Sequence, residues 1–475
     1  MRTNAALLAT LAILLFLSGY ASASTNCADH VPPSEPASIR VPVGTGFSFP
    51  TDQSLLHEFS QKKDIQKIRQ HAWAVFSGIT QPAVQGDPCT PVWDTWFSRI
   101  TPVADAGGKA LPIRLDISLE SVDAFFANQP RPAKGRATDE MLKDEGTLVD
   151  IIARALRGSG EQRLYNPAAH GFISDNHLYD PLAIEKQFQA VSGHAVAERS
   201  IRPFPRESIV LKAEWKTVAP GATTDLRYWD IDEKQLGCRG GCYKTVSVRL
   251  AGKDEKCNLP LTGEEDAVSS CFYTVNDDNQ PGNYLILVGL HVITKEMPDW
   301  TWSTFWWSPK ASTKSKFSAG RFDEPLISSF WRNYVMDTAL SMTTPAERRA
   351  TPGKIPEELD ACGQSWARKS KAKIVFNPYI EAPPEAEGPM INGPLSNCMN
   401  CHKRSTFPGF PNNDMRGTPW RGELASTAGC FREQIRLDYI WSLSPVAPDS
   451  RLAIFYNKVV HQLDTLQMPS RYQFR

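Results

Sequence analysis

The sequence shows no excess of charge of either sign, and after its N-terminus it contains no long apolar run. Its 475 residues include 52 Lys and Arg and 52 Asp and Glu, which gives a formal net charge of +0. This balance provides no overall attraction to nucleic acid or to an anionic membrane surface, and we expect no nucleic acid as a partner, while a local docking patch stays open. A membrane-spanning helix needs about 20 apolar residues, and we expect no transmembrane segment in the mature chain.

The N-terminus has the pattern of a secretory signal. Arg2 precedes an apolar run from Ala5 to Leu17, and the small residues Ala21-Ser22-Ala23 follow it. An Ala-x-Ala sequence after such a run is typical of a cleavage site, so residues 1–23 are predicted to be a signal peptide. Because no lipobox-like residues precede Cys27, a lipid anchor is not expected.

A single motif near the C-terminus, Cys398-Met399-Asn400-Cys401-His402, combines residue types and spacing that favour a particular chemistry. Cys398 and Cys401 are three residues apart, so on a helical turn both thiols can reach the two vinyl groups along one edge of a porphyrin. His402 follows at once and would bind the iron axially. The motif therefore predicts one covalently attached haem c, with the two cysteines binding the cofactor and His402 binding the metal.

Two other interpretations of the cysteine pair lack the sequence context that they need. A zinc site would require a second ligand pair, and no second Cys-x-x-Cys is present. A thioredoxin-like redox pair belongs near a βαβ pattern, whereas this pair follows a Pro-rich run. The single motif also weighs against di-haem peroxidases and rubber-type oxygenases, which need two attachment motifs.

The sequence leaves the iron ligand opposite His402 open. Met468 is the first candidate, because it lies in a Met-Pro dipeptide and a thioether ligand raises the haem potential, as suits an electron carrier. His461 would give two imidazole ligands and a lower potential. Met415 and Met399 are weaker candidates, and a site without a second protein ligand is a further alternative.

Eight cysteines remain outside the motif, and an even number in an exported chain favours disulfide bonds. Four of them are clustered and would form two local bridges: Cys238, Cys242, Cys257 and Cys271. The four outer ones could form two more: Cys27, Cys89, Cys362 and Cys430. The sequence does not fix the pairs, and a metal site in the cluster of four is the alternative.

The periodicity of apolar residues predicts an α+β protein. Helical spacing extends over 55–76, 139–198 and 450–466, and β-type runs cover 208–215, 243–250 and 283–294. The last of these runs is apolar on both faces, so it is expected to be a central strand of an antiparallel sheet or sandwich.

After the signal, we expect three regions. These are an α-rich N-terminal region (24–200), a β-rich region stapled by disulfides (201–345), and a Pro-rich arm with a mostly α or irregular haem c-binding segment (346–475).

A second candidate site follows the predicted central strand. His291 could serve as a distal base or ligand, Lys295 and Glu296 as polar tuners, and Trp302, with the tryptophans around it, as a wall or electron path. The structural alternative is a core histidine with a hydrogen bond, a surface ion pair and aromatic side chains that pack on the sheet. We carry His291, Lys295, Glu296 and Trp302 forward as catalytic candidates.

Three parts of the sequence also share the pattern of known proteins: 73–76 with 91–96, 290–296 with 300–305, and 397–402. Together they resemble a family of exported bacterial cytochrome c-type proteins that carry one haem motif near the C-terminus of a large non-cytochrome body. The resemblance spans most of the mature chain. It implies that Cys398 and Cys401 attach the haem and that His402 is an axial ligand, and it implies no role for the other two parts.

Three functions fit these observations. The first is electron transfer, with a redox partner protein or a small-molecule electron donor or acceptor. The second is an oxidoreductase with a substrate pocket near His291 and Trp302, and the third is a haem-based sensor of a small ligand. Haem attachment of this kind takes place on the outer side of the bacterial inner membrane, so the motif and the signal both predict the periplasm of a Gram-negative bacterium.

Overall fold

The computed structural model describes about half of the chain. The described residues are 27, 35–85, 87–98, 161–178, 181–229, 243–253, 255–261, 266–277, 282–311, 315–327, 329–340, 375, 377–380, 398–407 and 431–443.

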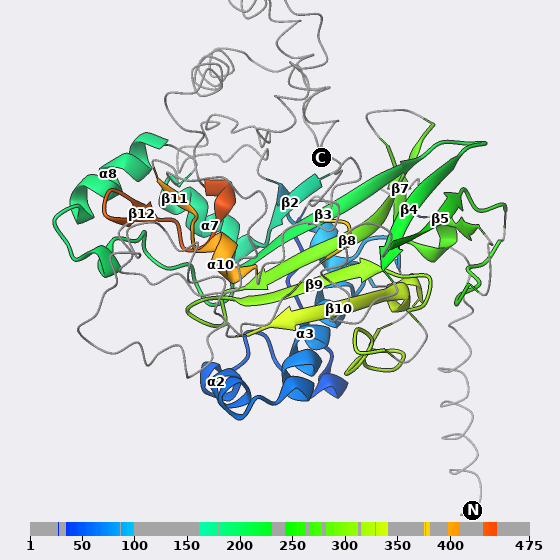
Figure 1. The fold of residues 1–475 in the computed structure, drawn as a ribbon, viewed down its shortest axis with the longest axis horizontal. Helices are drawn as coiled ribbons and strands as arrows, with labels where there is room; N and C mark the ends of the chain where they lie inside the picture. The colour runs from blue at the N-terminus through cyan, green and yellow to red at the C-terminus, as the bar shows by residue number, and fades with distance from the viewer. Residues whose placement is uncertain are drawn as a thin grey trace, which may run out of the picture.

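An antiparallel sheet forms the centre of the described structure (Figure 1). Its strands follow the order β1-β2-β3-β8-β9-β10, and β7 pairs with the start of β8 on the edge away from β3. Their bounds are β1 Phe97–Ser98, β2 Glu161–Tyr165, β3 Ile209–Val218, β7 Thr274–Asn276, β8 Tyr284–Thr294, β9 Thr301–Trp307 and β10 Tyr334–Ala339. Strands from the first two predicted regions therefore share one sheet.

Two smaller sheets accompany the central one. The first contains β4 Thr223–Trp229, β5 Tyr243–Arg249 and β6 Ala267–Val268, and the second pairs β11 Thr406–Phe407 with β12 Ile435–Arg436. The helices are α2 Gln53–Lys62, α3 Ile65–Ile79, α7 Pro167–Asp175, α8 Pro181–Val191 and α10 Met399–His402. Short 3-10 turns are η1 Val43–Thr45, η2 Val92–Thr95, η3 Val196–Glu198, η5 Ser269–Cys271, η6 Ser329–Asn333 and η11 Trp441–Leu443.

The predicted α+β class is confirmed, with the helices mainly in the N-terminal part. The three predicted β-type runs are strands β3, β5 and β8. Strand β8 lies between β3 and β9, and nearly all its residues from Ile286 to Thr294 are buried. A strand covered on both sides needs apolar residues on both faces, which is the pattern that the sequence showed.

Two helix predictions need correction. The spacing over 55–76 predicted one helix, but Lys63 has a φ of 54° and ends α2, after which the Asp64 side chain accepts a hydrogen bond from Lys67 N and caps α3. Within 139–198, Leu164 lies in strand β2 and not in a helix, because β2 pairs along its whole length with β3. The predicted helical residues 139–160 lie outside the described residues, and so does the predicted last helix over 450–466.

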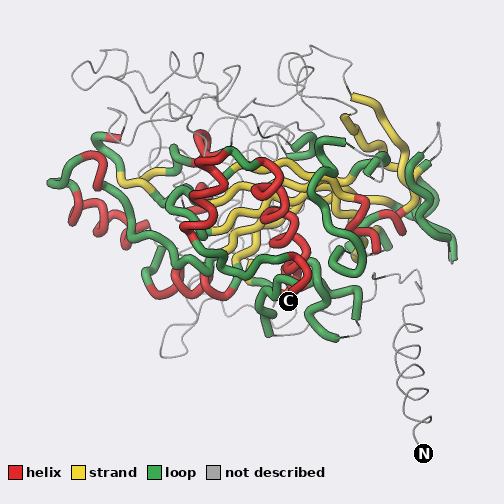
Figure 2. Tube along the Cα trace, turned by 90° about the horizontal axis from the view of Figure 1, so that it is seen from below, coloured by secondary structure: helices red, strands yellow, loops and turns green. Residues whose placement is uncertain are grey.

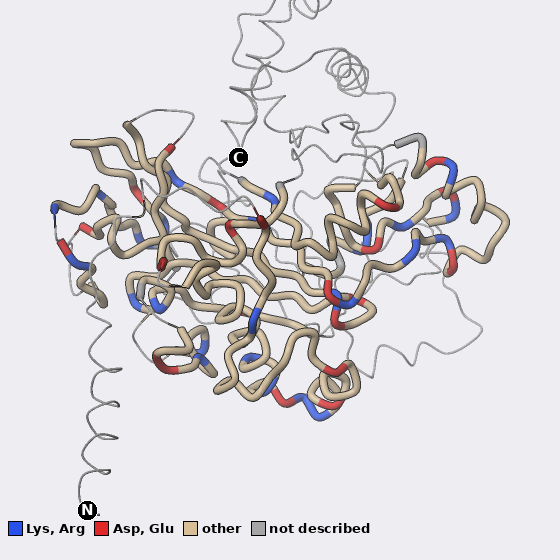
Figure 3. Tube along the Cα trace, turned by 180° about the vertical axis from the view of Figure 1, so that it is seen from behind, with Lys and Arg blue, Asp and Glu red and all other residues tan. Residues whose placement is uncertain are grey.

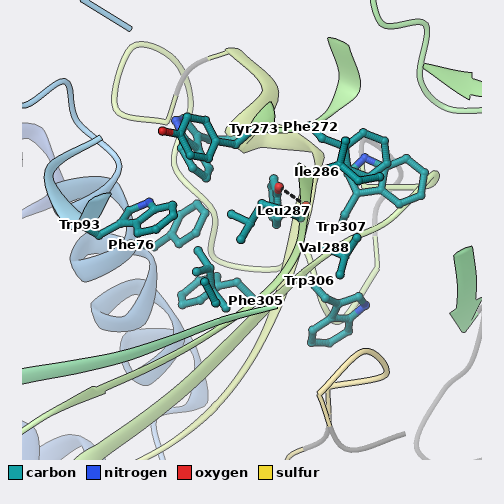
Figure 4. Close-up of a cluster of buried hydrophobic side chains, with 14 of the residues drawn as sticks. Phe76, Trp93, Phe272, Tyr273, Ile286, Leu287, Val288, Phe305, Trp306 and Trp307 are labelled. Carbon is teal, nitrogen blue, oxygen red and sulfur yellow. Dashed lines mark hydrogen bonds between the residues drawn. The ribbon is translucent and has the colours of Figure 1, made fainter. Parts of the chain in front are cut away.

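Helices α2 and α3 lie beneath one face of the central sheet, as the views in Figures 1 and 2 show. Trp73 and Phe76 of α3 pack on Phe305 of β9, and the Phe76 and Phe305 rings stack with centroids 4.2 Å apart (Figure 4). Trp93 is fully buried in the same core, so it acts as a packing residue. This core holds α3 on the sheet.

The opposite face carries the second cluster, which includes Tyr165, Ile293 and Trp302 from the sheet and Cys398 and Met399 from the haem motif. The elements α7, α10, β11 and β12 gather on this side (Figure 1). The sheet therefore separates the N-terminal helices from the C-terminal motif.

Two disulfide bonds connect the described cysteines, Cys27 with Cys89 and Cys257 with Cys271. Each bridge falls within one of the two predicted groups, while Cys238, Cys242, Cys362 and Cys430 lie outside the described residues. Such bonds are compatible with export to an oxidising compartment.

Residues 315–321 run along the outer side of β10. Met336 N donates to Phe317 O at 2.9 Å, and the Arg69 guanidinium donates to Ala319 O, Phe317 O and Met336 O at 2.8–2.9 Å. Arg321 donates to Tyr334 O at 3.4 Å. This segment is therefore fixed to both the strand and α3.

Charged residues of both signs are interspersed along the described chain, as the view from behind shows (Figure 3). Within the described ranges, no helix is long and apolar enough to cross a membrane.

Candidate functional site

The haem motif forms a single turn of helix against the second cluster. His402 N donates to Cys398 O at 2.9 Å, which closes the turn of α10. Cys398 is 6 % exposed and Met399 is 3 % exposed, so both side chains face the protein interior. The side chain of Cys401 lies outside the described part of the structure. The backbone of α10 nevertheless has the helical geometry that brings residues three apart onto one face.

The orientation of His402 is fixed by a backbone carbonyl. Its Nδ1 lies 2.8 Å from Tyr439 O. Because a carbonyl oxygen can only accept, Nδ1 carries the hydrogen, and the neutral ring then has its lone pair on Nε2. Among the described residues, we find no hydrogen bond to Nε2. Histidines that bind metals usually have this arrangement, with one nitrogen held by a hydrogen bond and the other facing the metal.

The electrostatic environment keeps this imidazole neutral. The pKa of His402 is lowered to about 3, chiefly by burial and to a smaller extent by electrostatic interactions with His291, Lys212 and Arg163. The hydrogen bond to the Tyr439 carbonyl acts in the opposite direction and is outweighed. Neutral imidazole is the form that binds iron, so the local environment favours the ligating state.

Trp302 forms a wall beside His402. The two ring centroids are 4.7 Å apart with planes inclined by 60°, and Trp302 is only 1 % exposed. Its Nε1 donates to Asp299 O at 2.8 Å, while the Tyr439 hydroxyl donates to Asp299 Oδ1 at 2.8 Å. The same short segment thus orients both the tryptophan and the residue whose carbonyl holds His402. From the sequence, Trp302 was a candidate wall of the second site or an aromatic side chain that packs on the sheet; in the structure its ring contacts that of His402.

His291 lies on the same sheet face as Trp302. The register pairs it with Thr304 of β9, while Trp302, two residues before Thr304, pairs with Ile293. On its other side His291 pairs with Lys212, and Lys212 pairs with Arg163. These side chains form a basic row across three strands, next to the row that carries Trp302. The side chain of His291 is half-buried, and its charge acts on His402.

Lys295 and Glu296 are adjacent in sequence but have separate partners. Lys295 Nζ donates to Asp438 Oδ1 at 2.6 Å and to Pro298 O at 2.7 Å. Burial lowers the pKa of Lys295 and raises that of Asp438, and the attraction between the two groups opposes both shifts. Lys295 is 5 % exposed, so its ion pair is buried and is not the surface ion pair of the structural alternative.

Glu296 joins a different polar group on the α3 side of the sheet. Its carboxylate accepts from Thr51 N at 2.6 Å and from the Thr294 hydroxyl at 2.5 Å, and it lies 3.1 Å from His71 Nε2. Although burial alone would raise it, the pKa of Glu296 is lowered by the charge of His71 and by these hydrogen bonds. Glu296 therefore connects the sheet to the N-terminal helices, away from His402.

The remaining ligand candidates are placed only in part. Met468, His461 and Met415 lie outside the described residues, and Met399 packs within the second cluster. Asp438 and Tyr439, the residues that hold Lys295 and His402, were not among the candidates from the sequence. No local sequence pattern indicates their roles. Asp438 contacts a residue that lies 143 positions away in the sequence, and Tyr439 contacts one that lies 37 positions away.

The residues of the motif fit a covalently attached haem. The fit rests on four features of the described residues. The Nδ1 of His402 is hydrogen-bonded, and its Nε2 has no hydrogen bond among these residues. Trp302 provides an apolar wall, and one helical turn carries both cysteines. In the described ranges, no three His, Cys, Asp or Glu side chains are grouped as a protein metal site would require.

Comparisons of this chain with protein-family models, with curated proteins and with solved structures found no match.

Proposed function

We propose that this chain is a periplasmic c-type cytochrome with one haem, and that it acts in single-electron transfer. One observation supports this most directly. The turn that contains Cys398 and Cys401 also presents His402 with its Nδ1 bonded to the Tyr439 carbonyl, so that Nε2 is available to an iron. The sequence spacing supplies the two thiols, and the fold supplies a neutral, oriented imidazole.

Each residue has a defined part in this proposal. Cys398 and Cys401 would form the thioether bonds, and His402 Nε2 would bind the iron. Trp302 fills the space between the imidazole and the sheet and keeps water from that side of the ring. The haem, when bound, would supply the reversible uptake and release of one electron. The large sheet body would then position this site toward a redox partner protein or a small-molecule donor or acceptor.

Spectroscopy of the protein, expressed with its signal and with haem-attachment machinery, tests the proposal. We expect one covalent haem per chain, reversible reduction by one electron, and weak or slow binding of carbon monoxide to the reduced form. A methionine ligand such as Met468 would also give a thioether-to-iron band near the red end of the oxidised spectrum, and its absence would exclude that ligand. Tight and rapid binding of carbon monoxide would argue against a closed electron carrier and for a ligand sensor.

The position of His291 supports a second candidate, a haem c-dependent oxidoreductase. His291 shares the sheet face of Trp302 and acts on His402 electrostatically, and Lys212 and Arg163 continue the basic row. A histidine and two cations in one row near His402 would suit an anionic substrate. This candidate keeps the same attachment residues and assigns the reacting groups to β2, β3 and β8.

The change His291→Ala separates the two candidates. If the protein is an oxidoreductase, we expect turnover with its electron-donating substrate to be abolished while the haem stays attached. The matched control is His57→Ala, since His57 is an exposed histidine of α2 on the other side of the sheet. Unchanged turnover in the His291 variant would remove this histidine from the reaction.

A further inference from the structure

The carbonyl that orients His402 belongs to an unusual turn. Asp438 and Tyr439 are consecutive residues with φ of 47° and 70°, in the left-handed region that side chains other than glycine disfavour. Of the six described non-glycine residues with positive φ, four gather here: Trp300, Cys398, Asp438 and Tyr439. Such conformations persist only where surrounding contacts impose them, and they concentrate at functional sites.

Contacts through Asp438 impose the conformation of this turn. Its Oδ2 accepts from Phe204 N at 3.0 Å, and its Oδ1 accepts from Lys295 Nζ at 2.6 Å. The backbone on either side is also tied down, since Leu437 N donates to Ser405 O and Ile440 N donates to Leu437 O. The carboxylate of Asp438 therefore anchors the turn to Phe204 and Lys295, in addition to the bond between the Tyr439 hydroxyl and Asp299.

Lys295 connects this turn to the wall of the site. It also donates to Pro298 O in the β8–β9 connection, and its ammonium lies 5.2 Å from the centre of the Trp300 ring. The same connection contains Asp299, whose carbonyl holds Trp302 and whose carboxylate holds the Tyr439 hydroxyl. One buried cation thus joins the segment that orients Trp302 to the turn that orients His402.

We propose that Lys295 and Asp438 are positioning residues for the axial ligand, and that their ion pair sets the strength of the His402 to Tyr439 hydrogen bond. The expected change in reduction potential rests on the proposed haem function, whereas the expected effect on the His402 imidazole does not. A strong hydrogen bond from Nδ1 makes the imidazole a better electron donor to iron and stabilises the oxidised state. Loosening the turn weakens that bond and makes the haem easier to reduce.

The double variant Lys295→Met with Asp438→Asn tests this inference without leaving an unpaired buried charge. The asparagine can still accept from Phe204 N, so the fold is expected to survive. In the haem-loaded protein we expect an upward shift of the reduction potential with unchanged haem content. The matched control is Glu296→Gln, which alters the neighbouring buried carboxylate that faces His71, and we expect it to lower stability without shifting the potential.

A second readout does not require the haem. In protein labelled with 15N at its nine histidines and prepared without haem, His402 can be assigned from its loss in His402→Gln. We expect the wild-type ring to have its hydrogen on Nδ1, and the double variant to show a mixture of both tautomers. A folded double variant with an unchanged tautomer and, in the haem-loaded protein, an unchanged potential would overturn the inference. A chain that never acquires haem would refute the proposed function but leave the tautomer result standing.

Discussion

Replacement of both motif cysteines, Cys398→Ala with Cys401→Ala, is expected to abolish covalent haem attachment completely. Each thioether needs one thiol, and no other Cys-x-x-Cys in the sequence can substitute for this pair. After denaturing electrophoresis, haem staining should detect the wild-type chain and fail to detect the variant at equal loading. This is the most decisive result for the proposed function.

The control for this experiment also removes two cysteines. The pair Cys257→Ser with Cys271→Ser breaks a disulfide of the β-rich part, which belongs to a different core cluster from the motif. We expect this variant to be less stable by about 2–3 kcal/mol but to retain haem staining. Staining that persists after loss of Cys398 and Cys401 would rule out attachment at the motif.

The largest loss of stability from a single substitution is expected for Phe305→Ala. Phe305 is 0 % exposed, stacks on Phe76, and meets the edge of Trp73 with ring centroids 5.4 Å apart. Removing a buried phenylalanine ring costs its transfer free energy and leaves a cavity, together about 3–5 kcal/mol. Urea unfolding followed by tryptophan fluorescence measures this change in the free energy of unfolding.

Ile65→Ala provides the comparison for Phe305. Ile65 begins α3, the helix that covers Phe305, but its side chain is 52 % exposed. We expect its free energy of unfolding to stay within about 0.5 kcal/mol of the wild type. Equal losses in the two variants would mean that α3 does not pack on the sheet as described.

Much of the sheet could be predicted because its signals are local. The alternation in β3 and the two apolar faces of β8 follow directly from strand geometry, so short segments of sequence were sufficient. Leu164 misled the helix prediction because a five-residue strand is too short to show its own period, and β2 is defined by its pairing with β3.

The candidate site was predictable only where spacing determines chemistry. The haem motif could be read from five residues, and Trp302 and His291 were selected by their place in an aromatic, strand-like segment. The sequence could not predict that Lys295 and Glu296 have separate partners, because Asp438 lies 143 residues from Lys295 and Thr51 lies 245 residues from Glu296. Pairs of buried charges that are distant in the sequence produce no periodic pattern from which they could be predicted.

The outer side of β10 has a consequence for how molecules of this protein meet each other. The edge strand of a sheet normally has unpaired backbone N–H and C=O groups that can pair with a strand of another molecule. Here Tyr334 O and Met336 O accept from arginines, Met336 N is bonded to Phe317 O, and Thr338 N donates to the side chain of Asp337. Strand addition by a second molecule would have to break these bonds first, so this border of the sheet is protected against edge-to-edge aggregation.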